Sequence, residues 1–155
     1  MLQLNLPEYQ FRLKQTEKGL LILDSLRKRF VKLTPEEWVR QNFLRYLIEH
    51  KQYPLALMAV EKQLIVNGLK KRCDAILYDI KGNPMIIIEL KAPNIPITQL
   101  VFDQVAVYNS KLKVKYFMIS NGFEHYCCKV NPENSSYLFF EGIPDYSLLL
   151  SDNSL

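Results

Sequence analysis

The sequence predicts an α+β domain in which helices pack against a mixed β-sheet, and three observations lead to this fold class. The expected elements follow one another as a β-hairpin, a helix, three strands, a second helix and three more strands. The run Met85–Ile88 is apolar on both faces, which is typical of a strand covered on both sides. The 155 residues, 48% of them hydrophobic, suffice for one core. We therefore expect a single domain over residues 1–155.

The first helix has a strong start signal. Thr34 can cap the helix, Pro35 suits its first position, and Glu37 can complete a capping box. Side chains that can face a core then recur at helical spacing, at positions 38, 39, 43, 46, 47 and 50. The residue before a proline avoids helical geometry, so the helix should end before Tyr53-Pro54.

Turn signals and apolar runs predict the remaining elements. Residues 19–24 and 29–33 should form a hairpin, preceded by a loosely attached arm at 1–18. Asn67-Gly68 and the segment 81–84 are turn signals that separate strands expected at 57–66, 73–80 and 85–90. A second helix is expected at 98–110, strands at 115–120, 123–130 and 137–140, and a helical turn at 146–150. Cys127 and Cys128 should face opposite sides of their strand.

Composition excludes several classes of function. The five glycines are too far apart to form a glycine-rich phosphate loop, so we expect no nucleotide cofactor. No apolar run approaches the roughly 20 residues that a membrane span needs. The three cysteines have no zinc-ligand spacing and are expected to be reduced, as in a cytoplasmic protein. The net charge of +4 permits a nucleic-acid partner without requiring one.

The most informative residues are Asp74, Glu89 and Lys91. Glu89 and Lys91 are two positions apart on one strand, so both should point to the same face. If Gly82-Asn83 is the centre of the preceding turn, Asp74 lies opposite Lys91, and Glu89 lies diagonally from Asp74 at about 7–8 Å. A register slip of one residue would move Asp74 to the other face. The three side chains are therefore predicted to form one patch.

Such a patch can support hydrolysis. Two carboxylates and a backbone carbonyl, that of Leu90, suit a hard cation such as Mg²⁺. A metal-bound water beside Lys91 could attack a phosphodiester, with Lys91 positioning or deprotonating the water or neutralising the developing charge. The alternative is an ordinary arrangement, because acids and lysines at strand ends are usually solvated or form simple ion pairs.

Asp74, followed by Glu89-Leu90-Lys91 after an apolar strand, resembles the signature of the PD-(D/E)xK nuclease superfamily. The resemblance is closer to one branch, the N-terminal nuclease domain of type I restriction enzyme R subunits. It covers about residues 29–130, and its motifs correspond to residues 34–41, 60–63, 71–74, 88–93, 104–108 and 120–122.

This resemblance implies a restriction-endonuclease-like αβββαβ core and DNA cleavage that depends on Mg²⁺ or Mn²⁺. Asp74, Glu89 and Lys91 would be catalytic, the two acids as metal ligands and the lysine as the group that serves the attacking water. Gln104, in a segment similar to a Gln-x-x-x-Tyr helix of that branch, would support the site or touch the nucleic-acid backbone.

The resemblance also implies supporting residues. Glu37 corresponds to a helix acid that often completes the metal site, and Glu61 on the first core strand competes for that role. Arg40 and Tyr108 are further candidates for support, the tyrosine as a packing residue with a hydrogen-bonding tip. Two basic clusters are candidates for phosphate contacts, although each alone is typical of solvated surface: residues Lys70, Lys71 and Arg72, and residues Lys111, Lys113 and Lys115.

The expected partner is DNA, with a homodimer or other restriction-system subunits as further possibilities. Type I R subunits carry an ATP-driven motor, and the absence of a Walker loop implies that translocation is absent here. Two other functions stay open at this point: a nucleic-acid-binding module that cleaves nothing, and a small interaction subunit with an incidental acidic patch.

Overall fold

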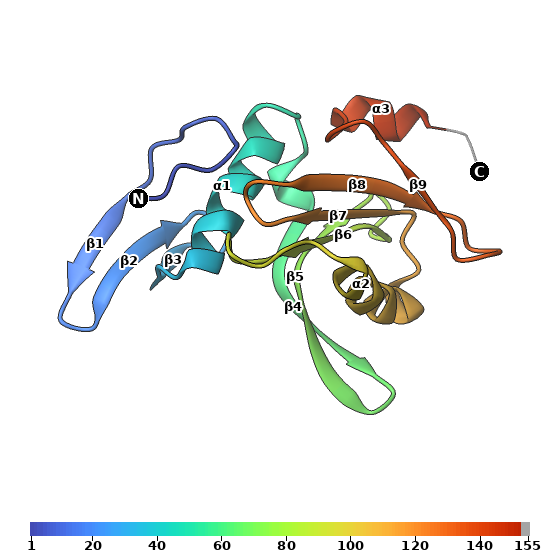
Figure 1. Ribbon diagram of the computed structural model, residues 1–155, viewed down its shortest axis with the longest axis horizontal. Helices are drawn as coiled ribbons and strands as arrows, with labels where there is room; N and C mark the ends of the chain where they lie inside the picture. The colour runs from blue at the N-terminus through green and yellow to red at the C-terminus, as the bar shows by residue number, and fades with distance from the viewer. Residues whose placement is uncertain (153–155) are drawn as a thin grey trace.

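The computed structural model describes residues 1–152 (Figure 1). It contains a three-stranded and a six-stranded sheet, with strands β1 (Leu13–Thr16), β2 (Gly19–Asp24), β3 (Arg29–Lys32), β4 (Met58–Val66), β5 (Leu69–Tyr78), β6 (Pro84–Leu90), β7 (Tyr116–Ser120), β8 (His125–Val130) and β9 (Tyr137–Phe139). The helices are α1 (Pro35–Glu49), α2 (Gln99–Leu112), α3 (Tyr146–Ser151) and a 3₁₀ turn at Leu55–Leu57. Within residues 1–152, none of the helices is long and apolar enough to cross a membrane.

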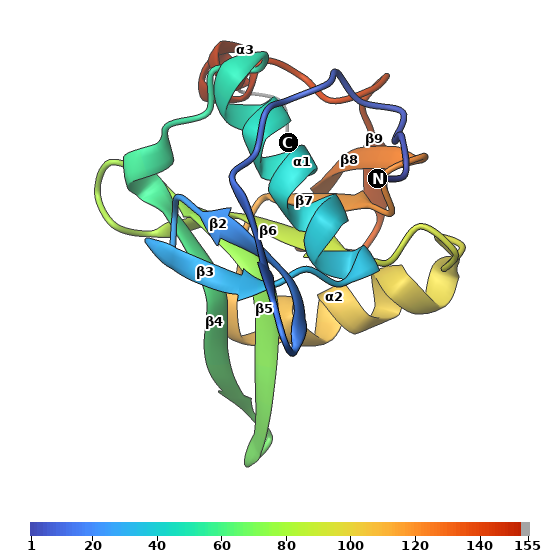
Figure 2. The ribbon, with the colours of Figure 1, turned by 90° about the vertical axis from the view of Figure 1, so that its left-hand side faces the viewer.

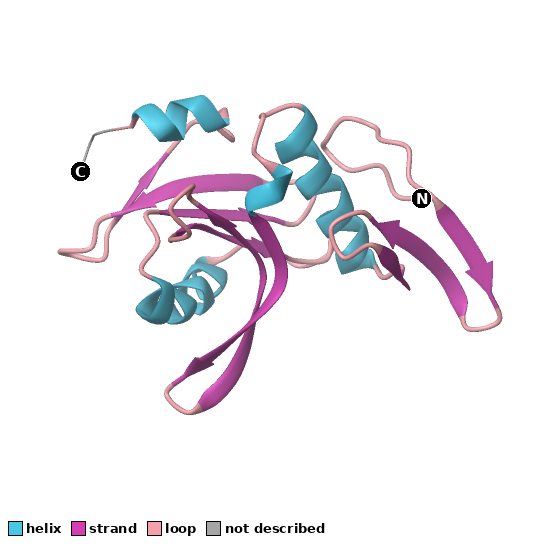
Figure 3. Cartoon of the chain, turned by 180° about the vertical axis from the view of Figure 1, so that it is seen from behind, coloured by secondary structure: helices cyan, strands magenta, loops and turns pink. Residues whose placement is uncertain are grey.

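The larger sheet is mixed, in the order β4-β5-β6-β7-β8-β9. Strands β6 and β7 are parallel and α2 connects them, whereas the other neighbours are antiparallel. The helices α1 and α2 lie on opposite faces of this sheet (Figures 1 and 3). This is the restriction-endonuclease-like αβββαβ arrangement, so the predicted fold class is confirmed.

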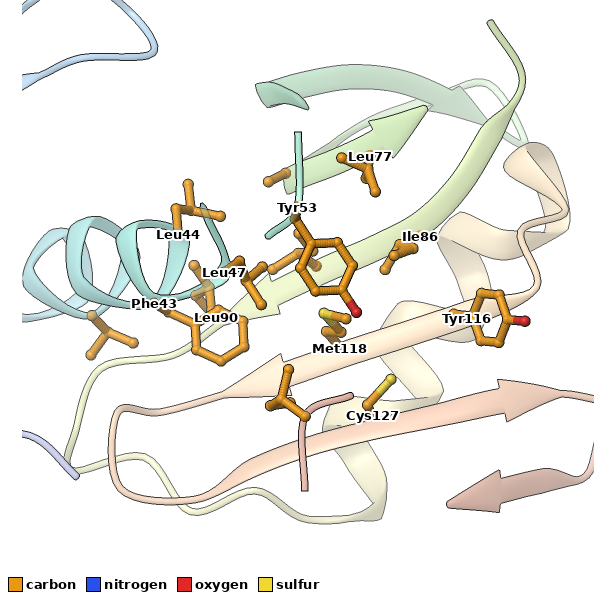
Figure 4. Packing of buried hydrophobic residues seen from close by; sticks show 14 of the residues in the cluster. Phe43, Leu44, Leu47, Tyr53, Leu77, Ile86, Leu90, Tyr116, Met118 and Cys127 are labelled. Carbon is orange, nitrogen blue, oxygen red and sulfur yellow. The ribbon is translucent and has the colours of Figure 1, made fainter. Parts of the chain in front are cut away.

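Two apolar clusters cover the two faces of the sheet. Against α1, the fully buried Phe43 and Leu47 share a cluster with Ile86 of β6 (Figure 4), and Ile88 of the same strand belongs to this cluster as well. Against α2, Ile87 packs with residues including Val101, Val105 and Phe117. Adjacent residues of β6 thus enter different cores, which confirms that this strand is covered on both sides. Cys127 and Cys128 likewise divide between the two clusters, as predicted.

The helix α1 begins where its start signal predicts. The Thr34 hydroxyl accepts a hydrogen bond of 3.0 Å from the Glu37 backbone N–H. The Glu37 carboxylate does not return to Thr34; it binds arginine side chains instead. One of the two hydrogen bonds of the expected capping box therefore forms, and the Glu37 carboxylate takes part in an ionic network in place of the other.

The β5–β6 register differs from the prediction by two residues. Ala75 pairs with Ile88, so one further step along the ladder sets Asp74 opposite Glu89, and Asp74 does not face Lys91. The cause is the turn, where the Asp79 carboxylate accepts hydrogen bonds from two backbone N–H groups and a bulge follows at Tyr78. A shift of two residues keeps every side chain on its face, so the shared patch survives the wrong register.

Residues 1–18 do not form a loosely attached arm, and that expectation is wrong. The segment ends in β1, which pairs with β2, and Leu4 is buried in the α1-side core. The Asn5 N–H donates to the Gly122 carbonyl at 2.8 Å, and the Trp38 indole donates to the Leu2 carbonyl at 2.7 Å. Gly122 makes the close approach possible, because a Cβ there would lie 2.8 Å from a Leu4 methyl carbon.

Candidate active site

The centre of the site is a pair of buried carboxylates on adjacent strands. Asp74 lies on β5 and Glu89 on β6, and only 7% and 3% of these residues are exposed. The backbone N–H of Leu90 donates to Asp74 Oδ2 at 2.9 Å, which fixes that carboxylate against β6. Glu89 Oε2 is buried and has no hydrogen-bond partner among the described residues. Burying an acid oxygen without a partner is costly, so this atom is a candidate ligand for a cation.

The two buried carboxylates repel each other, and burial disfavours the charged form of each. The pKa of Glu89 is raised well above its ordinary value, first by burial, then by the adjacent Asp74 carboxyl. The Lys91 charge acts in the opposite direction and is the smaller influence. A divalent cation would remove the repulsion between the acids and supply a partner for the orphan oxygen.

Lys91 connects this pair to α2. Its Nζ lies 3.8 Å from Glu89 Oε1 and donates to Gln104 Oε1 at 2.9 Å. The Gln104 amide in turn donates to the Tyr108 hydroxyl at 3.2 Å, across one turn of the helix. The structure thus gathers Lys91, Gln104 and Tyr108 into one chain of hydrogen bonds beside the carboxylates. Their roles in catalysis stay predictions.

Arg40 lies on the opposite side of the pair. Its Nη2 is 2.5 Å from Asp74 Oδ1, and its Nη1 is 2.6 Å from Glu37 Oε1. Glu37 also accepts from Arg27 Nη2 at 2.7 Å and from Gln41 Nε2 at 2.8 Å. Arg40 therefore stands between Glu37 and Asp74. The role of Glu37 in completing a metal site stays a prediction, and Arg40 would have to give way for it.

Glu61 is held in an unusual backbone conformation near this network. Its φ of +54° lies in the left-handed region that favours glycine, and the β4–β5 ladder skips it between Val60 and Lys62. Its carboxylate lies 3.1 Å from Arg27 Nη1 and 3.8 Å from Arg40 Nη1. The distortion thus places Glu61 among the arginines, although it does not reach the Asp74–Glu89 pair directly.

Several residues of this network were not expected from the sequence, and Arg27 and Glu36 are the most important of them. Arg27, in the β2–β3 turn, binds Asp24, Glu37 and Glu61, and no local pattern indicates contacts this far apart in the chain. Glu36 lies 3.6 Å from Arg40, and burial and the Asp74 charge raise its pKa. The i,i+4 spacing of Glu36 and Arg40 is the signal that could have indicated this acid.

A polar cavity of about 560 Å³ opens beside Arg40. It lies between β3, the first turn of α1 and β4, and its lining includes Arg29, Phe30, Lys32, Glu36, Arg40 and Glu61. Asp74 is not part of this lining, because the Arg40 guanidinium separates it from the cavity.

The predicted basic cluster at residues 70–72 lies in the first part of β5, and Arg72 Nη1 is 3.9 Å from Glu61 Oε2. Lys70, Lys71 and Arg72 are exposed on the β4–β5 hairpin, which projects from the body of the molecule (Figures 1 and 2). Lys70 pairs with Ile65 and Lys71 with the buried Leu64, so the two lysines point to opposite faces of the hairpin.

The donor set fits a hard divalent cation in part. Asp74 and Glu89 supply carboxylate oxygens, and the orphan Glu89 Oε2 is a free ligand atom. Residues 1–152 contain no group of three or more His, Cys, Asp or Glu side chains arranged to hold a metal ion. The remaining positions would therefore fall to backbone oxygen and water, as is usual for Mg²⁺. Arg40 already compensates Asp74 and is the group with which a cation would compete.

The fold and the paired acids next to a lysine define the class of restriction-endonuclease-like domains. Residues 35–144 match the family described as "Type I restriction enzyme R protein N terminus", and the chain belongs to this family. The resemblance inferred from the sequence motifs is thereby confirmed.

The solved structures that are similar to this chain include an HsdR fragment, which agrees with the fold. A fragment assigned to the HsdR subunit of a type I restriction enzyme from Vibrio vulnificus YJ016 superimposes with a TM-score of 0.56 at 16% identity, over 76% of this chain and 25% of that one. A protein of the DUF820 group from Anabaena variabilis ATCC 29413, assigned as a nuclease, has a TM-score of 0.48 at 11% identity, over 94% of this chain and 87% of that one. This chain thus spans a quarter of the length of the HsdR fragment. No curated protein matches the chain.

Proposed function

We propose that this chain is a Mg²⁺- or Mn²⁺-dependent nuclease domain that hydrolyses phosphodiester bonds in DNA. The observation that carries the proposal is the buried Asp74–Glu89 pair, with an orphan carboxylate oxygen and with Lys91 Nζ 3.8 Å from Glu89. Membership of the R protein family supports DNA as the substrate and a restriction system as the setting.

The residues of the chain would divide the work as follows. Asp74, Glu89 and the Leu90 carbonyl would hold the cation, which supplies charge stabilisation and an acidified water when bound. Lys91 would position that water or neutralise negative charge that develops on the phosphate. Gln104 would fix the direction of the Lys91 ammonium through the 2.9 Å hydrogen bond between them.

Partners are inferred from the family alone. The similar HsdR fragment is about four times as long as the matched region, so its other activities are not carried over. We infer that this chain acts on DNA as a homodimer or together with other subunits of a restriction system. A soluble, cytoplasmic setting would follow from that role.

One observation favours a second function. Arg40 compensates Asp74 and separates it from the neighbouring cavity, an arrangement that suits a nucleic-acid-binding module that does not cleave. The two functions make different predictions, because only the nuclease requires a bound cation.

Cleavage assays with Mg²⁺ or Mn²⁺ separate these functions. The native protein should cleave duplex, single-stranded or branched DNA, and Asp74→Ala and Lys91→Ala should abolish cleavage. Glu133→Gln, at an exposed loop acid, is the matched control and should cleave like the native protein. Equal cleavage by all four proteins would indicate a contaminant and reject the assignment, and no cleavage of any substrate would favour the binding module.

A further inference from the structure

The positive charge of this protein is concentrated in one small part of the chain. Residues 12–32 contain seven lysines and arginines and two acids, a net charge of +5, whereas the whole chain has +4. The rest of the chain therefore carries 13 basic and 14 acidic residues and is nearly neutral. Residues 12–32 include all of the three-stranded sheet β1–β3, which projects beside the start of α1 (Figures 1 and 2).

Most of this charge is available to a ligand. Six of the seven basic residues are exposed, and the exception is Arg27, which is held in the ionic network. Glu17 is the one exposed acid of this segment. No carboxylate of residues 1–152 forms a salt bridge with Arg12, Lys14 or Lys32. These three charges therefore have no acidic partner within the described part of the chain.

Strand pairing gathers three of the basic residues on one face of the sheet. Lys14, Leu21 and Lys32 lie side by side across the three strands, and so do Arg12, Leu23 and Phe30. Opposed residues share a face, so these two rows lie on the same side. The Lys14 ammonium lies 5.8 Å from the centre of the Phe30 ring, which agrees with this placement. On the opposite side, Ile22 and Asp24 are buried against the domain.

This outward side, made of Arg12, Lys14, Lys32 and Phe30, is called the N-terminal basic face below. It leads directly to the candidate active site. Phe30 and Lys32 line the same cavity as Glu36 and Arg40, and Arg40 touches Asp74. A polyanion that lies on this face therefore reaches the cavity that only the Arg40 guanidinium separates from Asp74.

We propose that the N-terminal basic face binds the phosphodiester backbone of a nucleic acid and guides it towards Asp74 and Glu89. This inference rests on the proposed function and identifies the surface that holds its substrate. Lysine and arginine neutralise phosphates and release counterions, and the apolar Phe30 ring between them offers a surface for a sugar or base. The face replaces the β4–β5 hairpin cluster as the main substrate-binding surface, because that cluster divides between two faces.

The test measures binding without any metal, so that it does not depend on catalysis. Fluorescence anisotropy in EDTA follows a labelled oligonucleotide, as a duplex and as a single strand of the same sequence. The variant is the triple substitution Arg12→Gln, Lys14→Gln and Lys32→Gln. The matched control is Lys51→Gln, Lys62→Gln and Lys81→Gln, which removes the same charge from positions outside this face and outside both predicted basic clusters.

The basic-face variant should bind at least about tenfold more weakly than the native protein. For the duplex, the slope of log K against log salt concentration should be smaller in magnitude by about 2.7. The control should stay within about twofold of native affinity, because only contacting charges release counterions. Weakening with either probe supports the proposal, and the more strongly affected probe identifies the strand state that the face prefers.

Two results would overturn the proposal: equal losses in the variant and the control, or no binding of either probe by the native protein at low salt. Failure of the proposed catalysis looks different. In that case the basic-face variant loses binding, but the native protein does not cleave with Mg²⁺ or Mn²⁺.

Discussion

The guanidinium of Arg40 bridges Glu37 and Asp74, with nitrogen–oxygen distances of 2.6 Å and 2.5 Å. A permanent cation therefore occupies the side of Asp74 that does not face β6. This arginine thus compensates one of the two buried acids. Four predictions about the site follow from this relationship and from the contacts around it.

Arg40→Gln should destabilise the metal-free protein by about 3–5 kcal/mol, because it leaves buried carboxylates without their counter-ion. Mn²⁺ should then raise the melting temperature of the variant more than that of the native protein, because binding is no longer opposed by the arginine. Thermal unfolding with EDTA and with Mn²⁺ measures both effects. Arg45→Gln, on the same helix with an exposed ion pair to Glu49, is the control. Equal metal-induced shifts in native protein and Arg40→Gln would refute the competition.

Glu89 should make stability fall as pH rises. Its pKa in the folded protein lies above its ordinary value of 4.5, so between these values the folded state binds more protons than the unfolded state. Stability is thus greatest below about pH 4.5 as far as this group is concerned, and it decreases as pH rises towards the folded pKa. Glu89→Gln should remove that slope. Urea unfolding in EDTA across this pH range measures it, with Glu133→Gln as control. Parallel pH profiles for native protein and Glu89→Gln would contradict the assignment.

Gln104→Ala should lower the cleavage rate by about tenfold to a hundredfold, because Lys91 loses the acceptor that directs its ammonium group. Oligonucleotide affinity in EDTA should not change, since Gln104 acts on the position of Lys91. Tyr108→Phe removes only the hydroxyl at the end of this chain and should have a smaller effect. Single-turnover cleavage and anisotropy separate the two quantities, and a loss of affinity with an unchanged rate would assign Gln104 to substrate binding.

Arg27→Ala should destabilise the protein by about 3–5 kcal/mol, because three carboxylates lose a largely buried partner. Arg29→Ala is the neighbouring control, an exposed residue whose removal should change stability by less than about 0.5 kcal/mol. Chemical denaturation compares the two variants. Similar losses in both would show that the contacts of Arg27 contribute little.

The local pattern of the sequence was sufficient for most of the elements, with β1 as an exception, and for the shared face of the central acids. The capping sequence at Thr34 and the apolar strand before Glu89 are short-range signals, and both are found where they were expected. The register was missed because the Asp79 side chain lengthens the turn, which no spacing argument includes. The predicted β5–β6 register was wrong by two residues, an even number, so the Asp74 side chain still lies on the predicted face of the sheet.

The arginine network was beyond the reach of sequence patterns. Arg27 and Glu61 meet only because the β2–β3 turn folds back onto α1 and β4, which is a long-range event. The N-terminal segment was missed for a related reason, since Leu4 is buried only because Gly122 leaves space for it. Contacts of this kind depend on shape complementarity between distant segments, which composition and periodicity do not encode.

The alternating chain of charges from Asp24 through Arg27, Glu37 and Arg40 to Asp74 runs from the β2–β3 turn to the buried acids without a break. Displacing any one member alters the partners of the next. Events at the turn and at the acids are therefore thermodynamically linked, and such linkage is reciprocal. If a ligand bound at the β2–β3 turn changes the affinity of the acids for a cation by some factor, the cation changes the affinity of the turn for that ligand by the same factor.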